Sequence, residues 1–409
     1  MKLPILLALV AALGSRVAVA ASPSDRWVGS WASAQMIPNA DDTVPRESFR
    51  NATLRQIVHL SVGGSRIRVR LANTFGTASL NLIAVHVARP VSRGSSRIDP
   101  ASDRVVTFDE KTEVSIPAGA EYTSDPLDYP VTPQSDLAVS LQLEAGPEQE
   151  TGHPGAHATS YLAANLSVSA AELPSAKTYE HWYFLSGVDV AATAGTRVVI
   201  ALGDSITDGH GSTTDGNDRW TDDLARRLQQ NEHTRDTALL NQGIGGNRLL
   251  TDGWGPNVLA RLDRDVFSQA GTRYLIVLEG INDIGMLTHS APATDAQHAE
   301  LVQRMIGAYR QIAMRAHAHG IKVIGATILP FMGSDYYHPG PADEHDRQAV
   351  NAWIRAPGHF DAVVDFDKVT ADPAHPERLR AEDDSGDHLH PSPAGYRAVA
   401  DAIPLELFR

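Results

Sequence analysis

Residues 197–209, RVVIALGDSITDG, decide the fold of the C-terminal half of the chain. Their apolar part, 198–202, is short and continuous, which is typical of a strand buried on both faces of a parallel sheet. Polar residues follow at once, where such a strand ends and a helix begins. We therefore expect Ser205, at this turn, to expose its hydroxyl near backbone N–H groups that can stabilise a developing negative charge.

The residues downstream repeat the pattern of a short apolar strand followed by a helix. Further strands are predicted at 237–240, 274–278, 322–328 and 360–366, and helices at 220–230, 299–319 and 395–403. Short apolar strands that alternate with helices predict a parallel sheet covered on both faces. Together with 198–202, this gives an α/β domain with a parallel five-stranded sheet, which we expect over residues 197–409.

The N-terminal half has a different pattern, with short alternating strands and frequent Pro, Gly, Asp and Ser. Apolar residues at 54–62 lead into Gly63-Gly64, and 67–71 alternates apolar residues with arginine, which predicts a hairpin with one buried face. More strands are predicted at 80–87, 104–108, 113–116 and 137–143. We expect residues 22–190 to form an antiparallel, jelly-roll-like β-sandwich domain, joined to the α/β domain by a linker at 191–195.

The first twenty residues have the pattern of a secretory leader. Lys2 supplies a positive charge, 3–14 is mostly apolar, and Ala18-Val19-Ala20 places small residues before a cleavage site. An uncleaved anchor is the alternative interpretation. The chain has no cysteine, so an exported protein of this length would depend on its cores rather than on disulfides. We expect a signal peptide over 1–20 and a secreted or periplasmic bacterial protein.

Charge and hydropathy exclude several classes of partner. The formal net charge is −14, and no basic run is present, so nucleic acid and anionic membrane surfaces are poor partners. Beyond the leader, no stretch of sequence is long and apolar enough to span a bilayer. We therefore expect neither a nucleic-acid partner nor an integral membrane segment after the leader is removed.

Three further polar clusters lie where they can meet Ser205. Residues 241–247 follow the second strand and are rich in glycine, so their backbone can approach a ligand and present an N–H donor. Asn282 follows the third strand, and its amide can donate to an oxyanion without carrying charge. Asp387 and His390 are three residues apart, so in a helical turn they face the same way. Asp387 could then hold one ring nitrogen of His390 while the other takes a proton from Ser205.

These motifs, Gly203-Asp204-Ser205, the glycine loop, Gly-x-Asn-Asp and Asp-x-x-His-Pro, occur in the order found in one known family. Residues 197–409 resemble the SGNH (GDSL) hydrolase superfamily of esterases, lipases and carbohydrate acetylesterases. The N-terminal half resembles, less specifically, the β-sandwich that precedes the hydrolase domain in some bacterial members. The resemblance implies a flavodoxin-like three-layer α/β/α fold.

The resemblance also implies roles for individual residues. Ser205 would be the nucleophile, and Asp387 and His390 its acid and base. The oxyanion hole would consist of the Ser205 backbone N–H, Gly246 and Asn282, with Gly243 and Gly245 as alternatives to Gly246. No metal and no other cofactor is expected.

Several neighbouring residues have simpler interpretations. Asp204 and Asp283 are expected to fix their loops by accepting backbone hydrogen bonds, and His388 to be a surface or pocket-lining residue. A metal site is the alternative for the cluster formed by Asp383, Asp384, Asp387, His388 and His390. Residues 336–340 either line a substrate pocket or form an ordinary surface loop.

The sequence thus predicts a secreted serine esterase that hydrolyses carboxylic esters through an acyl-enzyme. Short acyl groups are the leading candidate, with acetyl groups on a polysaccharide among them. A lipase acting on longer chains and transfer of the acyl group to another alcohol use the same residues. From a different class, a carbohydrate-binding or surface module with an inactive hydrolase half is the alternative.

Overall fold

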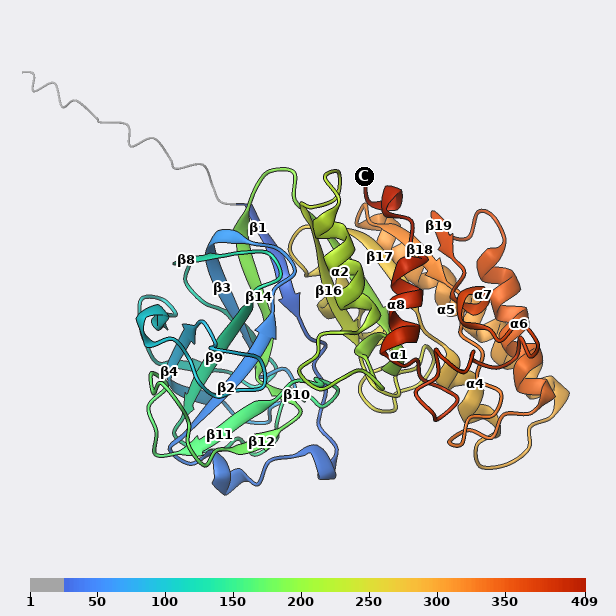
Figure 1. Cartoon of the computed structure of the whole chain (residues 1–409). Helices are drawn as coiled ribbons and strands as arrows, with labels where there is room; N and C mark the ends of the chain where they lie inside the picture. Colours follow the sequence, from blue (N-terminus) through green and yellow to red (C-terminus); the bar gives the residue numbers. More distant parts are fainter. Residues whose placement is uncertain (1–25) are drawn as a thin grey trace, which may run out of the picture.

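The computed structural model describes residues 26–409, so the predicted leader at 1–20 lies outside the described residues. Figure 1 shows the strands of the N-terminal half at one end of the molecule and the helices of the C-terminal half at the other. The last strand of the first half ends at Ala192, and the first strand of the second half begins at Arg197. The change of architecture therefore falls within four residues, 193–196.

The C-terminal half contains the predicted five-stranded parallel sheet. Its strands are β15 (Arg197–Gly203), β16 (Thr237–Gly243), β17 (Thr272–Leu278), β18 (Lys322–Ala326) and β19 (Ala362–Val364). Their order is β16-β15-β17-β18-β19, so β15 lies next to the edge, between β16 and β17. The apolar run 198–202 is fully buried in the sheet, as its unbroken hydrophobicity predicts.

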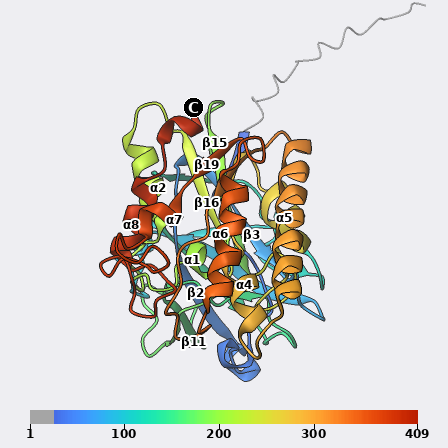
Figure 2. The same ribbon diagram turned by 90° about the vertical axis from the view of Figure 1, so that its right-hand side faces the viewer.

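Helices cover both faces of this sheet, and Figure 2 shows α2 and α8 on one side with α5 on the other. The helices are α1 (Ser205–Asp208), α2 (Trp220–Gln230), α3 (Val258–Leu262), α4 (Ile281–Thr288), α5 (Asp295–Ala318), α6 (Pro341–Arg355), α7 (Phe366–Thr370) and α8 (Pro393–Asp401), with a π-helical turn at Asp263–Phe267. The predicted helices α2, α5 and α8 are confirmed. The sequence did not indicate α3, α4, α6 or α7, which are short or have a sparse apolar stripe.

The N-terminal half is built from antiparallel sheets, as predicted. The first has the order β1-β14-β3-β7, with β8 also paired to β3, and the second has the order β12-β11-β2-β9-β4-β5, with β6 also paired to β4. A separate pair joins β10 to β13. The strands are β1 (Arg26–Ala32), β2 (Ala52–His59), β3 (Gly64–Ala72), β4 (Leu80–Ala88), β5 (Arg104–Val106), β6 (Val114–Ile116), β7 (Glu121–Thr123), β8 (Leu127–Val131), β9 (Asp136–Leu143), β10 (Gly152–His153), β11 (Ser160–Ala164), β12 (Lys177–Tyr179), β13 (Trp182–Tyr183) and β14 (Leu185–Ala192), and short 3-10 turns lie at Ala40–Asp42, Arg46–Phe49, Pro100–Ser102 and Leu405–Phe408.

The predicted hairpin across Gly63-Gly64 is wrong. Both of its strands exist, but β2 belongs to the larger sheet and β3 to the smaller one, so the chain crosses from one sheet to the other. The two glycines allow neighbouring backbone to approach closely and do not form a hairpin turn. A Cβ on Gly63 would lie 2.5 Å from the carbonyl oxygen of Val131, and one on Gly64 would lie 2.6 Å from that of Ala191.

The two halves share one continuous hydrophobic core. β1 packs beside β16, and the N–H of Gly29 donates to the carbonyl of Ala270 at 3.1 Å. The N–H of Leu239 in β16 donates to Ser61 Oγ at 3.1 Å. Buried side chains from Val28 in β1 through Leu240 in β16 to Phe408 belong to a single cluster. The parallel sheet is therefore covered at its β16 side by the β domain.

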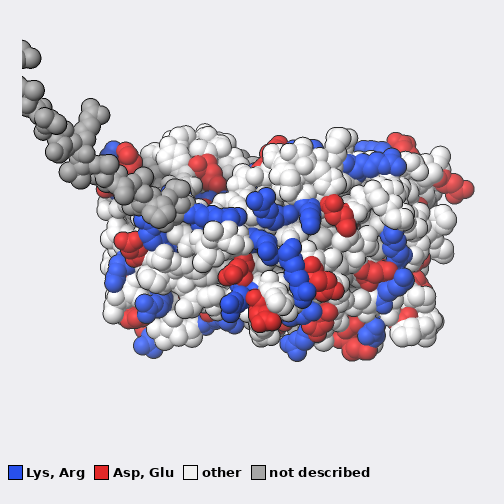
Figure 3. All heavy atoms as spheres, turned by 90° about the horizontal axis from the view of Figure 1, so that it is seen from above, with Lys and Arg blue, Asp and Glu red and all other residues white. Residues whose placement is uncertain are grey.

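Two surface properties bear on possible partners. On the face seen in Figure 3, basic and acidic side chains are interspersed over both halves. Between residues 26 and 409, no helix is both long enough and apolar enough to cross a membrane.

Candidate active site

Register across the parallel sheet brings the predicted site residues to one edge. Gly203 of β15 lies opposite Gly243 of β16 and Leu278 of β17, so the three strands end side by side. The loops that follow carry Ser205, the glycine-rich turn and Asn282. This edge is the position at which doubly wound sheets bind their ligands.

Ser205 is the first residue of α1, directly after the strand. Asp204 caps this helix, because its Oδ1 accepts the N–H of Ile206 at 2.9 Å. Burial raises the pKa of Asp204 to about 7, with the neighbouring Asp283 adding to the effect. Gly209 ends the helix at φ +113°, in the left-handed region. The expectation that Asp204 fixes its loop is met by this geometry.

A chain of hydrogen bonds joins three of the predicted residues. Ser205 Oγ lies 2.8 Å from His390 Nε2, and His390 Nδ1 lies 2.6 Å from Asp387 Oδ2. Since a carboxylate accepts, Nδ1 donates to Asp387, which leaves Nε2 as the acceptor for the Ser205 hydroxyl. Ser205 and His390 are both buried, at 8% exposed each. Such an arrangement can activate a serine hydroxyl as a nucleophile, with the histidine as base and the carboxylate orienting it.

Asp387 is held as an anion by the loop around it. Partial burial alone would raise its pKa, but His390 Nδ1–H and the backbone N–H groups of Leu389 and His390 hold the pKa well below its usual range. His388 points elsewhere. Its ring is exposed, and Nδ1 contacts Asp384 Oδ2 at 2.5 Å, so it is a surface residue, as expected.

The hydrogen bonds of the glycine loop separate the three candidate glycines. The N–H of Gly243 donates to Asn241 Oδ1 at 2.8 Å, and that of Gly245 donates to Asp208 Oδ2 at 2.9 Å. The N–H of Gly246 has no acceptor among residues 26–409. Gly246 adopts φ +69°, within a turn closed by the N–H of Asn247 and the carbonyl of Ile244 at 3.1 Å. Of the three, only Gly246 thus has an N–H free for a ligand.

Asn282 is fixed at both ends of its amide. Its Nδ2 donates to the carbonyl of Asn247 at 2.8 Å, which leaves the second N–H for a ligand. Tyr337 Oη donates to Asn282 Oδ1 at 2.6 Å and thereby sets the orientation of the amide. Asp283 accepts the N–H groups of Leu249 and Leu250, so it fixes the loop, as expected. Burial raises the pKa of Asp283 to about 6.

His210 is a site residue that the sequence did not indicate. Its ring lies against that of His390, with ring centroids 4.1 Å apart. Burial and the charge of His390 lower the pKa of His210. The only signal was its position five residues after Ser205. Among the described residues, His210, Asp387 and His390 place ligand atoms within 4.8 Å of one another. The hydrogen bonds from Asp387 through His390 to Ser205 account for two of these residues without a metal.

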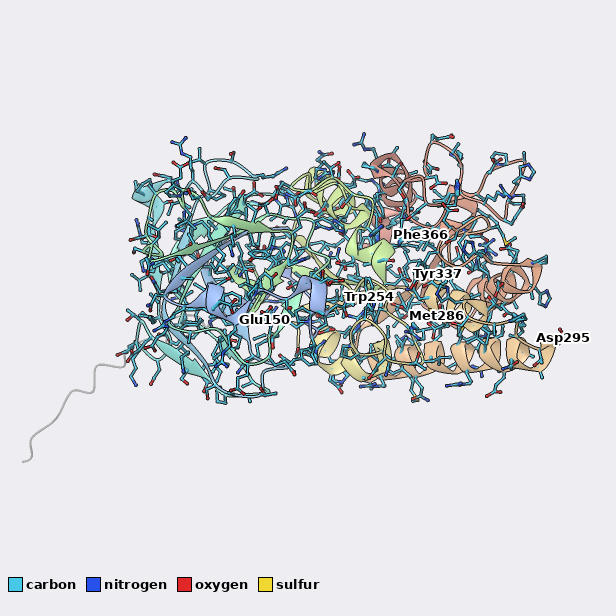
Figure 4. All side chains as sticks on the ribbon, turned by 90° about the horizontal axis from the view of Figure 1, so that it is seen from below. Glu150, Trp254, Met286, Asp295, Tyr337 and Phe366 are labelled. Carbon is cyan, nitrogen blue, oxygen red and sulfur yellow. The ribbon has the colours of Figure 1, made fainter. Side chains whose placement is uncertain are left out.

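A pocket of about 650 Å³ opens at Ser205, a size that suits a small-molecule site. It is lined by Gly246, Asn282, Arg248 and Trp254 from the α/β half and by Met36 and His157 from the β domain. Figure 4 shows Trp254, Met286 and Tyr337 close together, with Trp254 nearest the β domain. Tyr336 and Tyr337 both line this pocket, which decides between the two interpretations of 336–340.

The chain resembles known proteins over about half of its length. Residues 201–398 match the GDSL-like Lipase/Acylhydrolase family. No curated protein matches the chain. A GDSL-like lipase from Bacteroides thetaiotaomicron is 20% identical over 50% of this chain and 85% of that chain, with a TM-score of 0.37. An acetylxylan esterase from Geobacillus stearothermophilus is 20% identical over 52% and 93%, also with a TM-score of 0.37.

The family match spans the sheet from β15 to α8 and includes every loop of the candidate site. Asp387 and His390 come from the loop before α8, and Ser205 from the turn after β15. An all-antiparallel β region precedes the match. The C-terminal half of this chain, residues 201–398, is a GDSL/SGNH hydrolase domain.

Proposed function

We propose that the protein is a carboxylic ester hydrolase with Ser205 as its nucleophile. One observation carries the proposal, the continuous hydrogen-bonded chain from Ser205 Oγ through His390 to Asp387. His390 Nε2 takes the hydroxyl proton as Oγ attacks the ester carbonyl. The oxyanion is held by the N–H groups of Ser205 and Gly246 and by the free amide N–H of Asn282.

The second half of the reaction returns the enzyme to its starting state. His390 gives its proton to the alkoxide oxygen as the bond from the carbonyl carbon to that oxygen breaks, and the alcohol leaves. Water then enters, gives a proton to His390 Nε2 and attacks the acyl carbonyl carbon. The bond from this carbon to Ser205 Oγ breaks as His390 returns the proton to Oγ, which releases the carboxylic acid and restores the Ser205 hydroxyl. Asp387 stays ionised throughout and stabilises the imidazolium form of His390.

The pocket favours short acyl groups. Asp42 and Arg248 line it beside the apolar Met36 and Met286, whereas a long acyl chain needs a continuous apolar channel. Trp254 and Tyr336 are both 57% exposed at the pocket, so their rings can contact a large alcohol such as a sugar. We therefore propose acetyl esters, with acetylated polysaccharide as a candidate substrate. Export through the 1–20 leader, which would bring the enzyme to such a substrate, is part of the same proposal.

Hydrolysis of p-nitrophenyl acetate, butyrate, octanoate and palmitate by the full chain tests this function, with acetate release from acetylated xylan measured alongside. We expect the highest kcat/KM on acetate and loss of at least about 10³-fold in kcat for Ser205→Ala. Ser212→Ala, seven residues further along, is the matched control and should keep full activity. Full activity of Ser205→Ala would overturn the nucleophile, and a rise in kcat/KM with chain length would favour a lipase.

A further inference from the structure

The β domain places a buried histidine behind the glycine loop, with a hydrogen-bond partner at each of its two ring nitrogens. His153, the last residue of β10, is 3% exposed. Its Nδ1 lies 2.7 Å from the carbonyl oxygen of Ala34, and its Nε2 lies 2.8 Å from Asp208 Oδ1 in α1. A carbonyl oxygen can only accept, so Nδ1 carries a proton, and an ionised carboxylate accepts from Nε2 as well. The two contacts therefore favour an imidazolium form of His153, paired with Asp208 across the junction of the two halves.

The surroundings of His153 favour this charged form. Burial alone lowers its pKa, but the charge of Asp208 and the two hydrogen bonds raise the pKa above 6.5 overall. The other groups that face His153 are Arg219, which opposes its charge, and His157. Burial lowers the pKa of His157 to about 4, so His157 is neutral near pH 7 and adds no repulsion.

Asp208 also contacts the glycine loop at 241–247, which we call the oxyanion loop because it carries Gly246. While Oδ1 faces His153, Oδ2 accepts the N–H of Gly245 at 2.9 Å. Gly245 and Gly246 are the two central residues of one turn, so the placement of Gly245 also sets that of the free Gly246 N–H. An oxyanion donor must lie within a few tenths of an ångström of its best position to act fully.

The fit around Asp208 leaves little room for movement. A Cβ on Gly155 of the β domain would overlap Asp208 Oδ2, so the loop after β10 packs directly on the carboxylate. Arg219 binds the two halves together: Nε donates to the carbonyl of Asp208 at 2.8 Å, and Nη2 donates to the carbonyl of Ala156. Its guanidinium also lies over the ring of Trp182 in β13.

We propose that the β domain is part of the catalytic unit, and that His153 is a positioning residue that holds the oxyanion loop through Asp208. The inference rests on the proposed function, because it assigns the β domain a role in that same reaction. It also accounts for the β-domain residues that wall the pocket, Met36, Pro154 and His157. Loss of the His153 charge would leave Asp208 buried without its counter-ion and free the turn that presents Gly246.

The test compares full-length variants on p-nitrophenyl acetate. His153→Gln and Asp208→Asn should each lower kcat by about 10- to 100-fold while KM changes by less than about 3-fold. Because both act on one turn, the double variant should fall little below either single variant. His86→Gln is the matched control, because His86 contacts Asp103 at 2.9 Å within the β domain and does not line the pocket.

A pH profile separates positioning from general loss of structure. His153 acts as the imidazolium ion, so wild-type kcat should fall as the pH rises through its raised pKa, and His153→Gln should lack that alkaline fall. Melting temperatures show which variants are folded. Should His153→Gln not fold, Asp208→Asn decides by the same kcat criterion, since it removes the charge that pairs with His153 and leaves the size of the side chain nearly unchanged.

The outcomes distinguish the inference from the function on which it rests. An active wild type, an inactive Ser205→Ala and a His153→Gln variant with kcat within 2-fold of wild type would overturn the inference alone. Independent, multiplicative losses in the double variant would overturn it as well. A wild type with no esterase activity, or an active Ser205→Ala, would overturn the proposed function and this role together.

Discussion

At the scale of single residues, the site depends on side chains that orient other side chains. Asn282 was predicted from its motif, but Tyr337, which fixes its amide, lies 55 residues further along the chain. The ring of Tyr337 reaches Asn282 because it packs directly on Gly285 of α4, where any Cβ would overlap it. A local motif can indicate a donor, whereas the group that orients the donor comes from a distant loop that only the tertiary fold brings near.

Tyr337→Phe should therefore reduce turnover without weakening substrate binding. The variant keeps the ring and removes the hydroxyl that donates to Asn282 Oδ1, so the amide can rotate away from the oxyanion. We expect kcat to fall about 10- to 100-fold with KM nearly unchanged. Tyr336→Phe, on the exposed neighbouring ring, is the control in the same p-nitrophenyl acetate assay. Equal activity of the two variants would contradict this role.

A buried carboxyl in the β domain makes stability depend on pH. Glu150 is 7% exposed, and burial raises its pKa from 4.5 to about 7, although the N–H of Val44 donates to it. The folded protein therefore keeps a proton that the unfolded chain loses at lower pH. Because the unfolded state binds fewer protons in this window, the free energy of unfolding falls as the pH rises from about 4.5 to about 7.

Glu150→Gln should remove this pH-dependent decrease in the free energy of unfolding, which amounts to about 3 kcal/mol between pH 4 and pH 8. Urea unfolding at several pH values measures the free energy of unfolding. The variant should have a flatter pH profile than wild type over this window. Glu148→Gln, an exposed neighbour, should leave the profile unchanged. A profile for Glu150→Gln that follows wild type would show that Glu150 is not the group responsible.

At the scale of elements, the parallel sheet was predicted well and the β domain only in outline. The parallel strands contain short continuous apolar runs such as 198–202. Because both faces of such a run are buried, it can be recognised as a strand without deciding which face points to the core. In the β domain, strand positions were recognised but pairing was not, because Gly63-Gly64 has the same composition as a hairpin turn. Pairing in an antiparallel sandwich is set by contacts between distant strands, which one sequence does not reveal.

The ends of the strands that carry the site are tied together by Arg261 of α3. Its Nη2 donates to the carbonyl of Gly203 at 3.0 Å, and its Nη1 donates to that of Gln242 at 2.7 Å, so one guanidinium joins β15 to β16. The same Nη1 contacts Asp265 Oδ2 at 3.0 Å. This contact could not be predicted from the sequence, because α3 itself was not predicted.

Arg261→Leu should lower the free energy of unfolding by about 3 kcal/mol or more. The change removes a fully buried guanidinium that donates to two backbone carbonyls and to Asp265, which then keeps only Arg264 as its cationic partner. Arg315→Leu removes a partly exposed contact of α5 with Asp263, and it should cost less than about 1 kcal/mol. Urea unfolding of both variants measures the difference, and similar losses in the two would contradict the role of Arg261.

At the scale of the whole molecule, the two halves are one folded unit. The hydrogen bond from Leu239 to Ser61 and the packing of β1 beside β16 make the β domain cover the parallel sheet. The change in sequence pattern near 191–195 correctly predicts two different architectures. It does not indicate how the two halves pack against each other. Residues such as Gly29, whose missing Cβ makes room for Leu240, became informative only in the structure.

We therefore expect the chain to unfold in a single cooperative transition. A core that is continuous from Val28 to Phe408 does not separate into independent parts. Differential scanning calorimetry should give one peak whose calorimetric enthalpy equals its van't Hoff enthalpy. Two resolved transitions would show that the β domain and the α/β domain fold independently.

The central claim, that Ser205 is the nucleophile of an esterase, is tested most directly by covalent labelling. The full chain is treated with a fluorophosphonate, and the adduct is located by peptide mass spectrometry while p-nitrophenyl acetate hydrolysis is followed. Ser205, hydrogen-bonded to His390, should carry one adduct per chain, and activity should fall in proportion to labelling. An adduct on another residue, or full hydrolysis by the stoichiometrically labelled protein, would contradict the account.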